Sequence, residues 1–165
     1  MSSIACTTYA LASGSRALND GGMETPSCSK EAGSQGIKRL MQSAPYFLTN
    51  LGLKEGDTVG TLAWNTFRHF ELYFGVSGIG CVVNTVNPRL FPEQLTYIIN
   101  HAENQYLFID LSFVELVESL DSDLEGVKGY VILTDKDNMP DTKLNNAICY
   151  EDLISGESVD FDWSE

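Results

Sequence analysis

The side chains best suited to ligand chemistry lie close together in this sequence, between residues 61 and 95. An imidazole can transfer a proton, and a guanidinium can bind a carboxylate through two parallel hydrogen bonds. An indole offers a large apolar face with one N–H donor. The residues in question are Trp64, Asn65, His69, Asn87 and Arg89.

Most of these residues have a structural interpretation beside the functional one. Trp64 belongs either to the core or to a pocket wall, and Asn65 can cap a helix as well as bind a ligand. His69 is either a partly buried histidine satisfied by a neighbour or a polar group that faces a pocket. Arg89 either binds a carboxylate ligand or fixes its loop through an ion pair with an aspartate or glutamate, and we favour the second role.

The sequence lacks the short motifs that bind phosphate or build a nucleophile. The first predicted strand is followed by AWNTFRH, which has no glycine, and neither GxGxxG nor GxxxxGK[ST] occurs. There is no GxSxG elbow, and Cys81 and Cys149 have no evident histidine and acid partners. Asp110 and His101 stand at helix ends, where their charges complement the dipole. We therefore predict no catalytic residue and no cofactor site in this chain.

The composition excludes several classes of partner. Asp and Glu number 23 against 10 Lys and Arg, so the formal net charge is −13. This balance argues against nucleic acid and anionic lipid as ligands. The four cysteines show neither a CxxC spacing nor a Cys/His cluster, so no metal site is expected.

The sequence also bears on the location of the protein. The wide spacing of the four cysteines fits a reducing compartment, and we predict an intracellular protein, most simply a cytoplasmic one. No run of about 18 apolar residues occurs, so no transmembrane segment is predicted. The Ser-, Thr- and Ala-rich N-terminus leaves organelle targeting open.

Four short apolar runs predict β-strands, and the segments between them have helical periodicity. Residues 65–80 carry phenylalanines on one helical face, with Asn65 or Thr66 as the cap, and residues 92–102 begin with a proline that suits a first helical turn. The predicted strands are residues 58–64, 81–86, 105–110 and 129–135.

The third helix is predicted over residues 111–120. Ser112 and Glu115 have the spacing of a capping box, and Leu111 and Leu116 that of a hydrophobic staple. Because almost wholly apolar strands alternate with amphipathic helices, the fold class is α/β. It is a parallel sheet covered by helices and built from βαβ units. Reactive groups in such folds lie at the carboxyl ends of the strands.

The two ends of the chain differ from this middle part. Residues 1–35 are small and polar without periodicity, which predicts a disordered or atypical leader, and a helical pattern begins near Gly36. The acidic tail carries one short apolar segment, Ala147 to Tyr150, and we predict no closing element after it.

Residues 56 to about 163 resemble the N-terminal part of AMP-forming acyl-CoA synthetases, in the adenylating ligase superfamily. The similarity is highest to the medium- and long-chain fatty-acyl-CoA ligase branch. The residues that carry it are GDTVGTLAWNTFRHFELYFGVSGIGCVVNTVNPRLFPEQLTYIINHAE, LFIDLSF, YVILTD and MPDTKLNNAICYEDLISGE.

The resemblance implies that residues 36–165 are a partial N-terminal domain of such a ligase. Members of the family use Mg to convert a fatty acid, ATP and CoA to acyl-CoA, AMP and pyrophosphate. They bind phosphate with a TSGTTGxPKG loop, which this sequence does not contain. Trp64, Asn65 and His69 match the family pattern and are the candidates for a substrate-pocket wall.

The implied function is therefore a fragment of a fatty-acyl-CoA ligase that is inactive alone. The implied partners are a full-length acyl-CoA synthetase or a second copy of the chain. The alternatives are a non-catalytic module that associates with a full-length ligase, and an unrelated flavodoxin-like binding domain.

Overall fold

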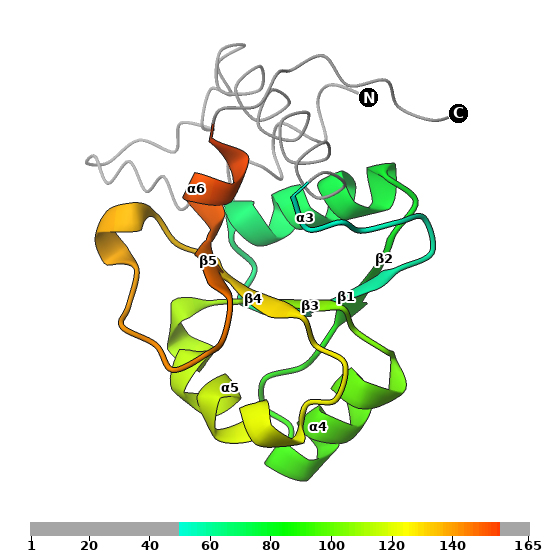
Figure 1. The fold of residues 1–165 in the computed structure, drawn as a ribbon, viewed down its shortest axis with the longest axis vertical. Coiled ribbons are helices and arrows are strands. Elements are labelled where there is room, and N and C mark those ends of the chain that lie inside the picture. The colour runs from blue at the N-terminus through cyan, green and yellow to red at the C-terminus, as the bar shows by residue number, and fades with distance from the viewer. Residues whose placement is uncertain (1–49, 156–165) are drawn as a thin grey trace, which may run out of the picture.

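The computed structural model describes residues 50–155, which form a five-stranded parallel sheet between two layers of helices (Figure 1). The strand order across the sheet is β2-β1-β3-β4-β5. The strands are β1 (Thr58–Leu62), β2 (Val82–Thr85), β3 (Tyr106–Ile109), β4 (Gly129–Ile132) and β5 (Ala147–Cys149).

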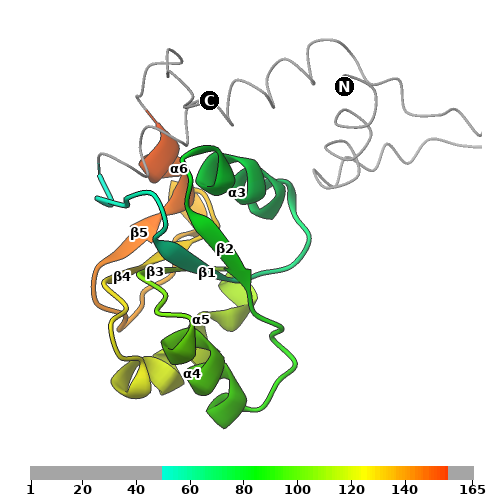
Figure 2. The ribbon, with the colours of Figure 1, turned by 90° about the vertical axis from the view of Figure 1, so that its right-hand side faces the viewer.

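Within residues 50–155, four α-helices cover the sheet, two on each face. Helices α3 and α6 lie on one face, and α4 and α5 lie on the other (Figure 1, Figure 2). None of the helices within residues 50–155 is long and apolar enough to cross a membrane. The helices are α3 (Phe67–Gly78), α4 (Pro92–His101), α5 (Val114–Leu120) and α6 (Tyr150–Ile154).

The central strands are apolar on both sides because each face is covered. Val59 and Phe108 belong to the core cluster that includes residues of α3 and α6. Leu107, Ile109 and Ile132 belong to the cluster that includes residues of α4 and α5. Burial on both faces explains why these strands read as continuous apolar runs rather than as alternating ones, as is usual for parallel sheets.

Gly60 allows β1 to pack closely against its neighbour on the α4 face. It pairs with Leu107 of β3, and a Cβ built on Gly60 would lie 2.4 Å from Leu107 Cδ2 and 3.1 Å from Asn104 Cγ. A larger residue would therefore force these buried side chains to move. The glycine leaves the space that Leu107 fills in the core.

The predicted α/β class, the parallel sheet and its helical cover are confirmed. The strands are shorter than predicted, since β1 ends at Leu62 and β4 at Ile132. The apolar segment from Ala147 forms the edge strand β5 and leads into α6, so the expectation of no closing element is wrong. The predicted leader, residues 1–35, and the helical pattern after Gly36 lie outside the described residues.

The capping box predicted at Ser112 is wrong. A single 3-10 turn (Leu111–Phe113) precedes α5, and Asp110 caps this turn by accepting the main-chain N–H of Ser112. Leu111 is 42% exposed, so it does not act as a hydrophobic staple. Asp110 competes with Ser112 for the capping role because a carboxylate is an equally good N-cap group.

Candidate functional site

The strand order places β1 and β3 side by side, and their loops leave the sheet toward opposite faces. At its carboxyl end β1 continues into α3 on one face, whereas β3 continues into α5 on the other face (Figure 1). Sheets of order 2-1-3-4-5 bind ligands at this switch point between β1 and β3. Residues 63–66 and 110–113 form the two loops, so they are the candidate site.

Trp64 joins the two loops at the switch point. Its indole Nε1–H donates to Ser112 Oγ at 3.3 Å, and its ring lies 5.0 Å from the ring of Phe113, centroid to centroid. The side chain is nevertheless 45% exposed. Trp64 is therefore partly packed and partly exposed at the carboxyl edge of the sheet.

His69 fixes the main chain beneath Trp64. The His69 ring is buried, with Nδ1 3.1 Å from Trp64 O and Nε2 3.0 Å from Thr61 Oγ1. A carbonyl oxygen can only accept, so Nδ1 carries the proton, and in the neutral ring Nε2 accepts from the Thr61 hydroxyl. Both ring nitrogens are thus occupied by protein groups, which fits a structural role for His69.

Burial also keeps His69 neutral. Desolvation lowers the pKa of the imidazole below its usual value, while the hydrogen bond to Trp64 O and the charge of Asp110 oppose this shift in part. In the neutral imidazole the Nδ1 proton is engaged by Trp64 O and the Nε2 lone pair by the Thr61 hydroxyl, so neither nitrogen is free to exchange a proton with a substrate. The site therefore lacks a general acid or base at this position.

Acid is expected to destabilise the fold through His69. The unfolded chain binds the proton more tightly than the folded chain because the folded pKa is lowered. The contribution of His69 to stability is therefore complete above about pH 6.5 and is lost as pH falls below that value. Urea unfolding followed by circular dichroism between about pH 7.5 and about pH 5.5 should show a smaller decrease in His69→Gln than in the wild type.

His101 provides the matched control, because it is exposed and is the other histidine of the chain. His101→Gln should not make this decrease smaller. Identical pH dependence in the wild type and in both variants would contradict the prediction.

Asn65, the third candidate for a pocket wall, is exposed beside Trp64. Thr66 rather than Asn65 caps α3, since its side chain accepts the main-chain N–H of His69 at 3.3 Å. The cap leaves the Asn65 amide at the surface of the candidate site. Trp64, Asn65 and His69 thus lie together at the end of β1, with two of them facing outward and the third buried.

The predicted ion pair of Arg89 with an aspartate or glutamate does not form within residues 50–155. Arg89 is exposed, its main-chain N–H donates to Asn87 Oδ1 at 3.0 Å, and no carboxylate among residues 50–155 pairs with its guanidinium. The side chain of Asn87 therefore shapes this loop by bonding the main chain two residues on.

Polar contacts between α3 and α6 were not predicted. Arg68 Nε lies 2.8 Å from Glu151 Oε1, and Tyr150 Oη–H donates to the fully buried Glu71 Oε2 at 3.1 Å. These partners are about 80 residues apart in sequence, as is typical of contacts that no local pattern reveals. They lock α6 onto α3 rather than forming a ligand site.

The buried thiols do not supply a nucleophile. Cys81 Sγ–H donates to Lys54 O at 3.1 Å, and burial raises the pKa of the Cys81 thiol to about 11. Cys149 Sγ–H donates to Thr134 O at 3.1 Å. A reactive cysteine needs an accessible thiolate, so both residues act as small apolar core groups.

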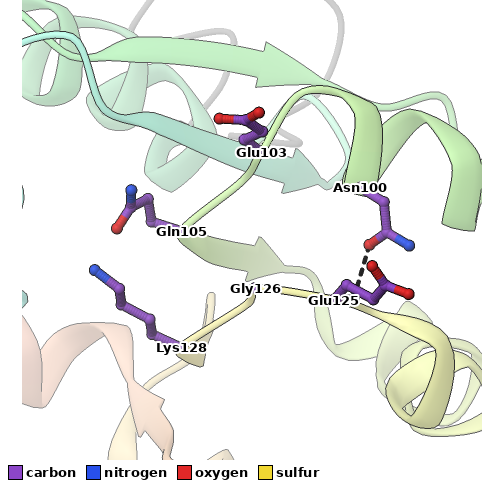
Figure 3. Close-up of a pocket in the computed structure, with 6 residues that line it drawn as sticks. All are labelled: Asn100, Glu103, Gln105, Glu125, Gly126 and Lys128. Atoms are coloured by element: carbon purple, nitrogen blue, oxygen red, sulfur yellow. Dashed lines mark hydrogen bonds between the residues drawn. The ribbon is translucent and has the colours of Figure 1, made fainter.

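A separate depression lies at the opposite end of the sheet, before β3 and β4. It has a volume of about 430 Å³, and Asn100 Oδ1 accepts the main-chain N–H of Glu125 at 2.9 Å on one side of it (Figure 3). Residues 50–155 contain no group of three His, Cys, Asp or Glu placed to hold a metal ion. The depression is lined by Asn100, Glu103, Gln105, Glu125, Gly126 and Lys128.

Known proteins resemble this chain in both sequence and fold. The family described as AMP-binding enzyme matches residues 38–156. A 3-methylmercaptopropionyl-CoA ligase of Ruegeria lacuscaerulensis is 45% identical over 76% of this chain and 23% of its own length. A medium-chain-fatty-acid–CoA ligase of Ectopseudomonas oleovorans is 38% identical over 87% of this chain and 26% of its own length.

The fold likeness agrees with the sequence likeness. An anthranilate CoA ligase solved with anthranoyl-AMP superposes with a TM-score of 0.71 at 20% identity, over 80% of this chain and 24% of its own. The chain therefore spans about a quarter of the length of the ligases it matches. These findings confirm the predicted resemblance and exclude an unrelated flavodoxin-like domain. The chain belongs to the family of AMP-binding enzymes.

Proposed function

We propose that these residues are the N-terminal part of a fatty-acyl-CoA ligase, which joins a fatty acid to CoA at the expense of ATP. The observation that carries the proposal is the family match over residues 38–156, together with the 38% identity to a medium-chain-fatty-acid–CoA ligase. Three buried strands with closely fitted helices make the segment a rigid frame, which is what a substrate pocket requires.

The carboxyl edge of this frame does not fit ATP. Trp64 and Phe113 occupy the switch point, and Asp110 adds a negative charge beside them. Phosphate groups need N–H donors and cations, whereas an aspartate repels them. ATP, Mg and CoA are therefore held by groups outside residues 50–155 in this proposal, and we place the phosphate-binding loop beyond the 165 residues.

The same edge fits a pocket wall for an apolar acid. Trp64 offers the open half of its indole, and Asn65 an exposed amide, while His69 holds the loop that carries both. An aromatic wall with few polar groups is typical of sites for small apolar ligands. We assign the wall to Trp64 and Asn65, with His69 behind them, and the chemical step to other parts of the ligase.

A segment exchange tests this function. In the Ectopseudomonas oleovorans ligase, the part that matches residues 38–156 would be replaced by those residues of this chain. We expect the chimera to form octanoyl-CoA at a rate no more than about tenfold below that of the parent ligase. A tenfold difference in rate corresponds to about 1.4 kcal/mol in the activation free energy. A folded, soluble chimera that forms no acyl-CoA would contradict the proposal.

Variants of the chimera test the wall itself. Trp64→Ala should raise KM for octanoate with little change in kcat, because a pocket wall contributes to binding in the ground and transition states alike. Tyr97→Ala is the matched control, since Tyr97 is 66% exposed on α4. Equal KM values for the two variants would mean that Trp64 is not part of the pocket.

A second candidate function is a non-catalytic module that pairs with a full-length ligase. It is favoured by exposed apolar groups near one end of the sheet, where Val82 of the edge strand β2 is 52% exposed and Phe74 of α3 is also 52% exposed. Unpaired strand edges beside apolar surface are common docking sites. Binding of the tagged 165-residue chain to a purified ligase, if Phe74→Ser weakens that binding, would support the module over the ligase fragment.

We place the protein in the cytoplasm under either function, because a reducing compartment suits the free thiols of Cys81 and Cys149.

A further inference from the structure

The indole of Trp64 is held by a serine that is itself held by a carboxylate. Ser112 Oγ lies 3.3 Å from Trp64 Nε1 and 3.0 Å from Asp110 Oδ1. Asp110 Oδ1 also accepts the main-chain N–H of Ser112 at 3.1 Å. The carboxylate thus fixes both the main chain and the side chain of the serine.

The chemistry of the three groups allows only one direction for these hydrogen bonds. An indole N–H can only donate, and an ionised carboxylate can only accept. The single hydroxyl proton of Ser112 must therefore point to Asp110, which turns a lone pair of Oγ toward Trp64. Asp110 orients the hydroxyl, and the hydroxyl in turn orients the indole.

The indole is fixed at a second point through its own main chain. His69 Nδ1–H donates to Trp64 O, so the loop beneath the ring is held from the α3 side while Ser112 holds the ring from the β3 side. The Phe113 ring packs against the same indole. An exposed side chain normally loses entropy when it is fixed in this way, so the contacts must offset that cost.

We propose that Ser112 is a positioning residue that orients the exposed part of the Trp64 indole toward the acyl substrate. The proposal rests on the function proposed above, in which Trp64 forms part of the pocket wall. Ser112 does not touch the substrate. It sets the rotamer of the aromatic side chain that does, and Asp110 keeps its hydroxyl in the accepting orientation.

The hydrogen bond is tested directly in the 165-residue chain. The sequence contains two tryptophans, Trp64 and Trp163, so a Trp163→Phe background leaves one indole N–H signal in a proton–nitrogen NMR spectrum. In that background Ser112→Ala should speed exchange of the indole proton with solvent by about fivefold, and Ser112→Thr should restore the slow rate.

Ser122→Ala is the matched control for this measurement. Ser122 also lies in a 3-10 turn and donates its hydroxyl to a neighbouring aspartate, Asp123, but Trp64 is not its partner. Ser122→Ala should leave the indole exchange rate unchanged. Equal exchange rates in the Ser112→Ala variant and its parent would overturn the proposal.

The role in substrate binding is tested in the chimera described above. Ser112→Ala should raise KM for octanoate by about fivefold with kcat unchanged, and Ser112→Thr should reverse most of this increase. A faster indole exchange without any change in KM would overturn the positioning role but leave the ligase function intact. A folded, soluble chimera without activity would overturn the ligase function, whatever the NMR result.

Discussion

Phe108→Ala is expected to lower the free energy of unfolding by about 3–5 kcal/mol. Phe108 lies in the middle strand of the sheet, is fully buried, and packs in the cluster that joins the strands to α3 and α6. Alanine would leave a cavity that the flanking strands cannot close, since β1 and β4 are hydrogen-bonded to β3 on both sides. Urea unfolding followed by circular dichroism measures the loss.

A nearby leucine provides the control for this loss. Leu111 follows the same strand three residues later but is 42% exposed, so Leu111→Ala should change stability by no more than about 0.5 kcal/mol. A large difference between the two variants supports a sheet covered on both faces. Similar small losses for both would mean that the α3 face of the sheet is open in solution.

The fold was predictable from the sequence because its strongest determinants are local. The runs that became β1, β3 and β4 are apolar and short, and the helices between them have a clear apolar face. Pro92 lies in the first turn of α4, as expected for a residue without an N–H. These features depend on residues a few positions apart, so a sequence pattern records them.

Details that depend on competition between neighbours were predicted less well. Asp110 and Ser112 can both cap the turn before α5, and the choice depends on the direction in which the chain leaves β3. The same is true of Asn65 and Thr66 at the start of α3. For α3 the sequence offered both residues, whereas before α5 it predicted Ser112 and the structure has Asp110 as the cap.

Contacts between distant segments could not be predicted at all. The hydrogen bond from Trp64 to Ser112 spans 48 positions, and the ion pair of Arg68 with Glu151 spans 83. Each depends on the strand order, which brings together segments that are far apart in the sequence. The candidate residues at the end of β1 were therefore found from their types, but their partners were not.

The second large effect concerns the chemistry of adenylation. We expect the 165-residue chain to show no fatty-acid-dependent exchange between pyrophosphate and ATP, although the segment-exchange chimera shows it. Adenylation needs donors and a metal ion aimed at the phosphates, and such groups contribute factors of about a hundred to a thousand each. The carboxyl edge of this sheet instead presents Trp64, Leu111 and the carboxylate of Asp110.

The most direct test is this pyrophosphate–ATP exchange measurement, made on two samples in parallel. It tests whether the chain supplies only a pocket wall while the reacting groups lie elsewhere in the ligase. The samples are the 165-residue chain and the chimera, each with octanoate, ATP, Mg and labelled pyrophosphate. We predict exchange only in the chimera, with an octanoate dependence that Trp64→Ala weakens. Exchange catalysed by the 165-residue chain alone and abolished by Asp110→Ala would contradict the assignment, because it would place reacting groups on this edge of the sheet.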